Sequence, residues 1–357
     1  MNLDLSNLGT VTLDAPSLRP APNGPASPFL VPHPTEPNSY ILRVDNSTLT
    51  KFQTCPRASE YYNLFRRTSN TSPALVFGGA IHQGLEVLYR NGFTEESLLI
   101  AKQRCAQHFV DNPVIMDWRT DAHALTCIDK YYDTFKHDDS ISIFQYDGAP
   151  FVERSFEVQV GHIDIEDYFP YEPKLLLGHY YDEIKHCGPS LLISRLHIHW
   201  IGKIDAVVHH YGKLMVMDHK TTTMLGDTFF ADFDLGQQPI GYTWACQQIL
   251  GYRPDGFLVN PLALRKPTPT GKSFEFPPRK PYYYTDAQLT EWHQNTMTLV
   301  SDFVSHTLRG FFPMSTVWCV GKYGMCPYHQ VCTLPTSQRP IMLSTSNFSN
   351  VTWDPTT

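Results

Sequence analysis

The feature of the sequence that most constrains the fold is a predicted β-hairpin over residues 201–221. Two segments in which apolar side chains recur flank the tetrapeptide His210-Tyr211-Gly212-Lys213. Residues two apart in a strand point to the same face, and a short connection with glycine favours an antiparallel pair. The apolar residues of the two segments include Ile204, Val207, Val208, Leu214 and Val216. The sequence therefore predicts a hairpin buried within a larger sheet.

Charged residues interrupt both strands of this hairpin. Asp205 stands on the first strand, and Asp218 and Lys220 stand two apart on the second, hence on one face. Two carboxylates on adjacent strands form an oxygen-rich site suited to Mg²⁺ or Mn²⁺. A neighbouring lysine can orient a water, and these parts together can attack a phosphodiester. The alternative is a surface hairpin with an exposed Asp218–Lys220 pair, but the apolar flanks favour the first interpretation because buried charges need partners.

The rest of the chain alternates between helical and strand periods. Helical spacing predicts a helical block over about 78–138, and period-two alternation from Val152 to Val160 predicts a strand. After the hairpin, the sequence predicts a helix over 237–250, a strand over 255–262, a Pro-rich loop to Pro281 and a helix over 286–309. Together these elements predict an α/β fold with a mixed central sheet, within 150–265, flanked by helices.

Composition limits the organisation and the partners. Residues 1–38 contain eight prolines and predict a flexible arm, 39–335 predict a single domain, and the Ser/Thr-rich residues 336–357 predict a tail. The net charge of −7 excludes a uniformly basic nucleic-acid coat protein but permits a local basic groove. The chain has no apolar run of about 18 residues and no expected secretory signal. Its sparse cysteines fit a reducing compartment, so a cytoplasmic protein is expected.

Further motifs flank the hairpin in a recognisable order. Gly78-Gly79-Ala80-Ile81-His82 opens a predicted helix, Gly202-Lys203-Ile204-Asp205 and Asp218-His219-Lys220 lie on the hairpin, and Gln238 and Tyr242 stand four apart on the next helix. In this order the motifs resemble the PD-(D/E)XK nuclease superfamily, in its RecB-like exonuclease branch. The resemblance extends over about residues 47–332. It implies a restriction-endonuclease-like core and a metal-dependent hydrolase.

The resemblance also implies a role for the matched residues. It makes His82 a metal ligand on a helix, Asp205 and Asp218 the carboxylate ligands, and Lys220 the catalytic lysine. His219 would offer its backbone carbonyl to the metal. Without the family context, a histidine at a helix start is more often a core or capping residue.

Two supporting residues and one further acid complete the predicted site. Gln238 and Tyr242 would support the site and contact DNA, although alone they could be ordinary exposed residues of a helix. Glu153, on the strand before the hairpin, is either an additional metal-facing acid or part of the polar face of its strand.

Three cysteines cluster late in the sequence, and a fourth candidate lies far upstream. Cys319, Cys326 and Cys332 fall within fourteen residues, and Cys55 precedes Pro56. Thiolates are soft ligands, so four of them suit zinc or an iron–sulfur centre, but this chain lacks the close C-x-x-C pairs of zinc modules. The arrangement resembles the [4Fe-4S] staple of RecB-like and CRISPR-associated nucleases, which implies a cluster closing on Cys55. The family's late cysteines commonly include a C-x-x-C pair, and here the first gap is wider.

The other cysteines are expected to be buried thiols without a metal: Cys105, Cys127, Cys187 and Cys246. Basic residues near Cys55 predict the border of a DNA entrance, although a solvated helix face would have the same composition. These residues are Lys51, Arg57, Arg66 and Arg67.

The sequence therefore predicts a metal-dependent DNA nuclease, an exonuclease acting on DNA ends or single strands, in a bacterial or phage setting. Recombination, repair or replication proteins are the expected partners. One alternative is a non-catalytic, nuclease-like DNA-binding subunit, which the intact His82, Asp205, Asp218 and Lys220 disfavour. Another is a zinc-stapled structural protein, which would lack the visible colour of an iron–sulfur centre.

Overall fold

A mixed β-sheet organises the molecule. The computed structural model describes residues 30–64, 67–69, 72–115, 117–165, 193–268, 272–309, 311–321 and 324–350. Within these residues a nine-stranded sheet has the order β1-β2-β8-β9-β10-β11, with β4 and β7 also paired to β8 and β12 paired to β10. The β2–β8 and β9–β10 pairs are parallel and the others are antiparallel. The predicted α/β class with a mixed central sheet is confirmed.

The predicted hairpin is formed by β8 (Arg195–His210) and β9 (Lys213–Thr222). Val207 pairs with Val216, and His210 pairs with Lys213 across a two-residue turn. Tyr211 and Gly212 both have positive φ, 48° and 79°. This is the backbone of a type I′ turn, whose twist matches that of paired strands. The hairpin therefore lies where its alternation predicted.

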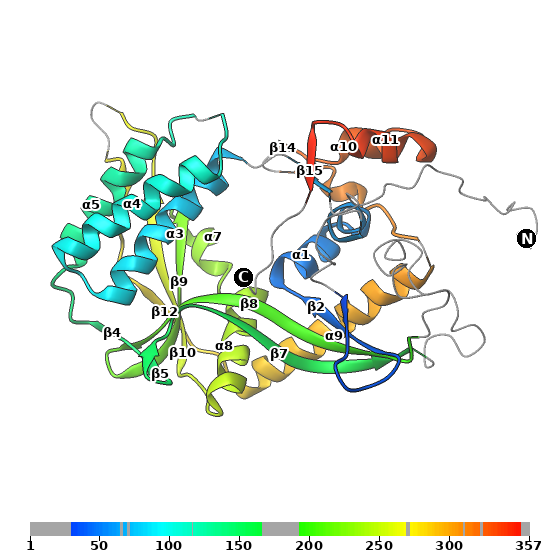
Figure 1. Cartoon of the computed structure of the whole chain (residues 1–357), viewed down its shortest axis with the longest axis horizontal. Coiled ribbons are helices and arrows are strands. Elements are labelled where there is room, and N and C mark those ends of the chain that lie inside the picture. Colours follow the sequence, from blue (N-terminus) through cyan, green and yellow to red (C-terminus); the bar gives the residue numbers. More distant parts are fainter. Residues whose placement is uncertain are drawn as a thin grey trace, which may run out of the picture.

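Helices cover both faces of the sheet (Figure 1). One face carries α3 (Pro73–Asn91), α4 (Glu95–Asp111) and α5 (Asp121–Phe135). The other carries α8 (Gln237–Leu250) and the start of α9 (Asp286–Arg309). Alternate residues of β9 reach the two cores, because Met215 and Met217 pack with α3 and α5 whereas Leu214 and Val216 pack with α8 and α9. The expected helical block and both later helices are confirmed, but α3 begins at Pro73, so Gly78 and Gly79 lie inside the helix and do not open it.

Strand β10 (Gly256–Leu264) lies next to β9 in the sheet and is buried throughout. The Pro-rich segment expected as a loop contains two short strands, β11 (Phe274–Glu275) and β12 (Lys280–Tyr282), both paired with β10. The smaller elements are α7 (Asp227–Ala231), β4 (Ile141–Ile143), β5 (Gln145–Tyr146) and β6 (Ala149–Pro150). No helix among the described residues is long and apolar enough to cross a membrane.

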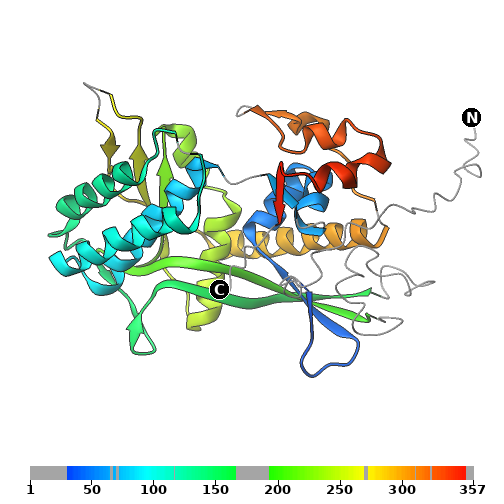
Figure 2. The same ribbon diagram turned by 45° about the horizontal axis from the view of Figure 1, so that its top comes forward.

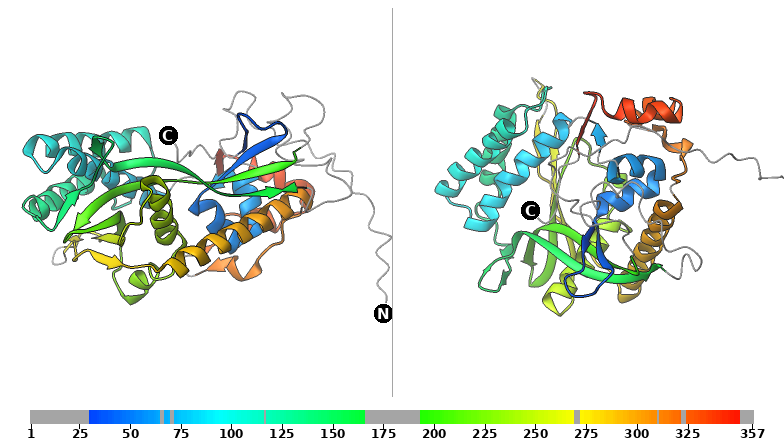
Figure 3. Two further views of the ribbon diagram at one scale, coloured as in Figure 1. Left: turned by 90° about the horizontal axis from the view of Figure 1, so that it is seen from below. Right: turned by 45° about the vertical axis from the view of Figure 1, so that its right-hand side comes forward.

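Strands β7 (Val152–Asp164) and β8 continue far beyond the hairpin and form an extension of the sheet (Figures 2 and 3). Strand β2 (Ser39–Val44) pairs with β8 there, and β1 (Leu30–Pro32) pairs with β2 at the edge. The prediction of a flexible arm over 1–38 is therefore wrong for residues 30–38, which are part of this edge. Proline is tolerated in a strand at an edge position. Residues 1–29 lie outside the described residues.

A small module combines a segment that follows β2 with the last described residues of the chain (Figures 1 and 2). Its early part consists of α1 (Asn46–Thr54), α2 (Pro56–Ser59), a π-helical turn (Glu60–Leu64) and β3 (Arg67–Ser69). Its late part consists of a 3₁₀ turn (Thr316–Trp318), β13 (Val320–Gly321), β14 (Gly324–Met325), α10 (His329–Cys332), a second 3₁₀ turn (Thr336–Gln338), α11 (Arg339–Leu343) and β15 (Phe348–Asn350). We call these two parts together the cysteine module.

The cysteine module has its own core, built by side chains from both parts: Tyr61, Tyr328, Val331, Leu343 and Phe348. Strand β15 pairs antiparallel with β3. The tail expected over 336–357 is therefore folded as far as Asn350, and residues 351–357 lie outside the described residues. The end of α9 packs on this module, because the rings of Phe303 and Phe52 meet edge to face at 5.6 Å. Helix α9 thus links the module to the sheet.

Candidate active site

The two predicted carboxylates lie on neighbouring strands near the middle of the sheet. Asp205 on β8 precedes Ala206, which pairs with Met217, the residue before Asp218 on β9. Asp205 is 9% exposed and Asp218 is 3% exposed. The backbone N–H of His219 donates to Oδ2 of Asp205 at 2.7 Å. The register of β8 and β9 therefore places Asp205 and Asp218 opposite each other.

Two further side chains converge on Asp205. His82, on α3, places Nδ1 3.5 Å from Oδ2 of Asp205. Glu153 stands opposite Asp205 on β7, between the pairs Val152–Ala206 and Arg154–Ile204. One ligand atom each from His82, Glu153 and Asp205 lies within 4.8 Å of the other two. An imidazole and two carboxylates are a donor set that suits Mn²⁺ or Mg²⁺.

The backbone of Glu153 is held in an uncommon conformation. Its φ is 49°, in the left-handed region that residues other than glycine rarely adopt. Such strain persists only where surrounding structure enforces it, and it is concentrated at functional sites. Here it interrupts a run of regular strand pairs and accompanies a carboxylate aimed into a buried acidic cluster. Because of this backbone conformation, the alternation of the strand assigns Glu153 to a polar face, whereas its carboxylate lies with those of the acidic cluster.

Electrostatics at this cluster favour a cation. Burial, followed by the charge of Asp218, raises the pKa of Asp205 to about 8. Burial, followed by the charge of Asp205, raises the pKa of Glu153 to about 7, although Lys203 lies 3.2 Å from its carboxylate. Burial lowers the pKa of His82 and keeps its imidazole neutral, as a metal ligand must be. A divalent cation would relieve the repulsion between these acids, so the residues present fit such an ion.

Lys220 forms a second group beside the acids. Its Nζ lies 2.8 Å from Oδ2 of Asp218 and donates to Oε1 of Gln238 at 3.0 Å. Burial favours the neutral amine, but the charges of Asp218 and Asp205 outweigh it and raise the pKa of Lys220. Gln238 is in the first turn of α8 and also hydrogen-bonds Tyr242, one turn later. Gln238 and Tyr242, four residues apart as noted in the sequence, therefore connect α8 to Lys220 on β9 through hydrogen bonds.

Gly202 allows α8 to approach the sheet. A Cβ at this position would lie 2.8 Å from the ring of Phe156 and 3.0 Å from Oη of Tyr242. The φ of Gly202 is not positive, so the requirement is for space and not for backbone freedom. The glycine of the Gly202-Lys203-Ile204-Asp205 motif is thus explained by the close packing of Tyr242.

A buried polar network behind the site was missed by sequence reasoning. Asn260 on β10 lies beside His219 in the parallel register, and its Nδ2 is 2.6 Å from Nδ1 of His219 and 2.7 Å from Oη of Tyr131. Tyr131 in turn lies 2.6 Å from Oη of Tyr89. Asn260 is 1% exposed. The signal that could have found it is an amide in the middle of the otherwise apolar strand Gly-Phe-Leu-Val-Asn-Pro-Leu-Ala-Leu.

The four clustered cysteines are brought together in the cysteine module. All are free thiols. The backbone N–H of Cys326 donates to the carbonyl of Cys319 at 2.9 Å. Burial, and then the proximity of Cys55 and Cys319, raises the pKa of Cys326, while burial and the proximity of Cys326 and Cys55 raise that of Cys332. Cys105, Cys127 and Cys246 are buried elsewhere, and Cys187 lies outside the described residues.

Two of the basic residues predicted to border DNA, Lys51 and Arg57, have side-chain partners within the protein. Lys51 lies 4.1 Å from the ring centroid of Tyr62. Arg57 donates to the carbonyl of Phe312 at 2.7 Å and pairs with Glu60 at 3.2 Å. Arg67 lies in β3, where its carbonyl accepts a hydrogen bond from Oη of Tyr328 at 2.6 Å, and Arg66 lies outside the described residues. These contacts hold the cysteine module together.

Comparisons with known proteins give one family. A family model described as the PD-(D/E)XK nuclease superfamily matches residues 46–333. A search of curated protein sequences finds no match. A crystal structure from Eubacterium rectale, described as a "putative exonuclease", is similar with a TM-score of 0.40 and 12% identity, over 76% of this chain and 83% of that one.

Proposed function

The chain belongs to the PD-(D/E)XK nuclease superfamily, and from this premise we propose that it is a deoxyribonuclease that uses Mg²⁺ or Mn²⁺. The observation that carries the proposal is the acidic cluster around the buried Asp205 and Asp218, beside the partly buried Lys220. His82, Glu153 and Asp205 offer ligand atoms within 4.8 Å of one another, and Lys220 pairs with Asp218 next to them. Buried like charges are costly unless a cation compensates them.

The proposed metal ligands are His82, Asp205 and Glu153, with Asp218 and the carbonyl of His219 at the same site. When bound, the divalent ion supplies Lewis-acid activation of the scissile phosphate and of the attacking water. The chain's own residues orient the reacting groups. Lys220 remains an ammonium beside Asp218, so it can donate hydrogen bonds to the attacking water or to a phosphate oxygen. Gln238 restricts the lysine to that position.

In the reaction, water adds to phosphorus and the bond between phosphorus and the leaving oxygen breaks. Catalysis then depends on positioning and on neutralising the charge that develops on the phosphate oxygens. Tyr242 packs against Gly202 and hydrogen-bonds Gln238, so it keeps α8 and the lysine in register. We include Tyr242 and Gln238 among the residues that contact DNA.

Within the superfamily we propose a RecB-like exonuclease that acts in DNA recombination, repair or replication. The support is the motif order Gly202-Lys203-Ile204-Asp205, Asp218-His219-Lys220 and Gln238-x-x-x-Tyr242. The test is digestion of matched linear end-labelled and covalently closed circular DNA, single- and double-stranded, with Mg²⁺ or Mn²⁺. An exonuclease degrades the linear forms only. Cleavage of closed circles at a comparable rate would make the enzyme an endonuclease, and no cleavage of any substrate would contradict the nuclease proposal itself.

We also propose that Cys55, Cys319, Cys326 and Cys332 hold a [4Fe-4S] cluster. In support, the four thiols converge from both parts of the cysteine module. The chain lacks the close C-x-x-C pairs of zinc modules, so an iron–sulfur centre fits these four thiols better than zinc does.

A further inference from the structure

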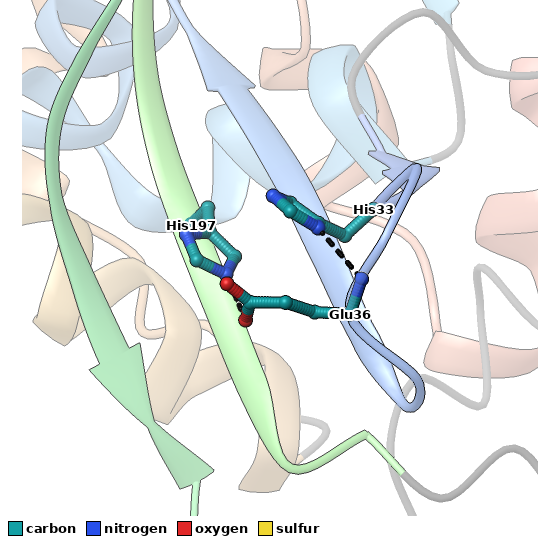
Figure 4. Close-up of side chains that lie close together, drawn as sticks. All are labelled: His33, Glu36 and His197. Carbon is teal, nitrogen blue, oxygen red and sulfur yellow. Dashed lines mark hydrogen bonds and ion pairs between the residues drawn. The ribbon is translucent and has the colours of Figure 1, made fainter.

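A second cluster of ligand-bearing side chains lies on the extension of the sheet (Figure 4). His33 and Glu36 come from the turn between β1 and β2, and His197 comes from β8. One ligand atom from each lies within 4.8 Å of the other two. Oε2 of Glu36 is 2.8 Å from Nε2 of His197, and the two imidazole rings stack with centroids 4.3 Å apart. Nothing in the catalytic proposal uses these residues.

We propose that His33, Glu36 and His197 form a second metal site, selective for a first-row divalent transition ion such as Zn²⁺, Co²⁺ or Ni²⁺. Two imidazoles and one carboxylate are the donors that these ions prefer, whereas Mg²⁺ and Ca²⁺ require more oxygen ligands. Three protein ligands leave positions for water. His197 is 6% exposed, whereas the Glu36 side chain is 44% exposed, so one side of the site is open to an entering ion.

This site is separate from the catalytic acids. His197 and Asp205 stand eight residues apart on β8 (205 − 197), which is about 26 Å at about 3.3 Å per residue. His197 pairs with Ile41 of β2 and His162 of β7, on the part of β8 that continues beyond the hairpin. An ion at one site would therefore not share a ligand with an ion at the other.

The hydrogen bonds of His197 can rearrange so that its Nε2 is free to coordinate an ion. Nδ1 of His197 lies 3.2 Å from Nε2 of Gln159, and the Gln159 amide can rotate so that its oxygen accepts from Nδ1–H instead. Nε2 of His197 would then present its lone pair to the ion, which replaces the proton now shared with Glu36. A hydrogen-bond partner on the second ring nitrogen is the usual way in which proteins orient a histidine ligand.

To bind an ion through Nδ1, His33 would have to give up two hydrogen bonds. Its Nδ1 accepts hydrogen bonds from the backbone N–H groups of Glu36 at 3.1 Å and Thr35 at 3.5 Å. Coordination through Nδ1 would replace these long bonds. An ion and a proton compete for the same imidazole nitrogen, so His33 must coordinate in its neutral form.

The consequence of binding would be structural. Glu36 and His197 are 161 residues apart in sequence, and their contact fastens the β1–β2 turn onto the strand beneath it. An ion held by His33, Glu36 and His197 would bind only when the turn is docked. Binding to the folded state alone raises its stability. We therefore expect the ion to raise the melting temperature of the protein without supporting cleavage.

The test uses Co²⁺ as the probe and the full chain, without a polyhistidine tag, in an Asp205→Asn/Asp218→Asn background that disables the proposed catalytic site. Equilibrium dialysis or calorimetry gives the stoichiometry, and visible absorption reports the ligands. His197→Ala is compared with His199→Ala, a histidine on the same face of β8 that is bound to Glu157 at 2.7 Å and does not belong to the cluster. Glu36→Gln is the second variant, because it keeps a hydrogen-bond acceptor for His197 but removes the anionic ligand.

The proposal predicts one Co²⁺ per chain that is lost in His197→Ala, weakened about tenfold or more in Glu36→Gln, and retained in His199→Ala. Co²⁺ should raise the melting temperature of the background protein and of His199→Ala only. Equal Co²⁺ binding in all variants would overturn the proposal. So would a background protein that binds no Co²⁺ attributable to His197, since the cluster would then be only a hydrogen-bonded latch. These outcomes do not depend on whether the protein cleaves DNA.

Discussion

The strands that carry the acidic cluster (β7, β8 and β9) and the cysteine module both gather side chains from distant parts of the chain, but they do so by different means. On the strands, register places Asp205, Asp218 and Glu153 together, and two large cores maintain that register. In the module, short helices and turns carry Cys55 to the late cysteines over a core of only a few side chains. We therefore expect substitutions in the strands to affect chemistry and substitutions in the module to affect folding.

Burial acts against the ionised ligands in both regions. It raises the pKa values of Asp205 and Glu153 on the strands and those of Cys326 and Cys332 in the module. We expect the sheet to keep its fold without a metal, because two apolar cores pack against it. The module has far less apolar surface to bury, so its fold depends more on what the thiols bind. This difference can be tested one region at a time.

The largest effect on stability is expected for Cys55→Ser. Loss of a ligand that links Cys55 to the late cysteines opens a long loop, which costs about 5–6 kcal/mol in the loop-entropy treatment. Cys246→Ser is the control, because Cys246 is also buried but lies in α8 away from the other thiols. We expect Cys55→Ser to lose iron and melt at a much lower temperature, while Cys246→Ser keeps its iron. Normal iron content and melting in Cys55→Ser would remove this residue from the cluster.

An increase in stability is expected for Asp205→Asn in a chelating buffer. The folded-state pKa of Asp205, about 8, is above its ordinary value of 3.8. The folded protein therefore holds a proton that the unfolded chain releases, and stability decreases as the pH rises between these values. The variant should melt higher than the natural protein at pH 8, with a smaller difference at pH 5, and should not cleave DNA.

Exposed Asp232, changed to Asn, is the control for this pH dependence, and it should leave the decrease in stability unchanged. If Asp205→Asn melts lower than the natural protein at pH 8, then the buried carboxylate stabilises the fold and our account of the acidic cluster is wrong.

A smaller loss is expected for Gly202→Ala. The new methyl group would meet the ring of Phe156 and Oη of Tyr242, and overpacking of this kind costs about 1–3 kcal/mol. Because Tyr242 is displaced, cleavage should decrease along with stability. Gly226→Ala is the control, since a Cβ at Gly226 would meet nothing within 4 Å. Equal melting temperatures of the two variants would show that α8 does not depend on the close approach at Gly202.

The smallest effect is expected for the network behind the site. Asn260→Ala removes the hydrogen bond to His219, and loss of such an indirect contact commonly weakens metal affinity about tenfold. Tyr131→Phe keeps Asn260 and its bond to His219, so it should have a weaker effect. The measurement is the Mn²⁺ concentration at half-maximal cleavage for each variant. An unchanged Mn²⁺ requirement in Asn260→Ala would make the network purely structural.

The sequence was sufficient for elements whose signals are local. The hairpin followed from alternation, and α8 from Pro239 in its first turn and Gly251 just past its end. The meeting of Asp205, Asp218 and Lys220 followed from their positions on the hairpin. The left-handed backbone of Glu153 is imposed by neighbouring strands, so its convergence with His82 and Asp205 could not be read from periodicity.

The missed features depend on long-range pairing. Strands β1 and β15 have three residues each, and they form only because β2 and β3 are beside them. Proline at the end of β1 made residues 30–38 appear unstructured, although an edge strand tolerates it. Asn260 gave a local signal, one amide in an apolar strand, but its partners Tyr131 and His219 come from other elements.

The most direct test of the central claim is the rate at which Lys220→Ala cleaves end-labelled linear DNA in Mg²⁺ or Mn²⁺. Lys213→Ala, at the other end of β9, is the matched control. We predict that Lys220→Ala stays folded but cleaves about 10²- to 10³-fold more slowly, while Lys213→Ala cleaves at the natural rate. A folded Lys220→Ala protein that cleaves at nearly the natural rate would contradict the assignment of the active site.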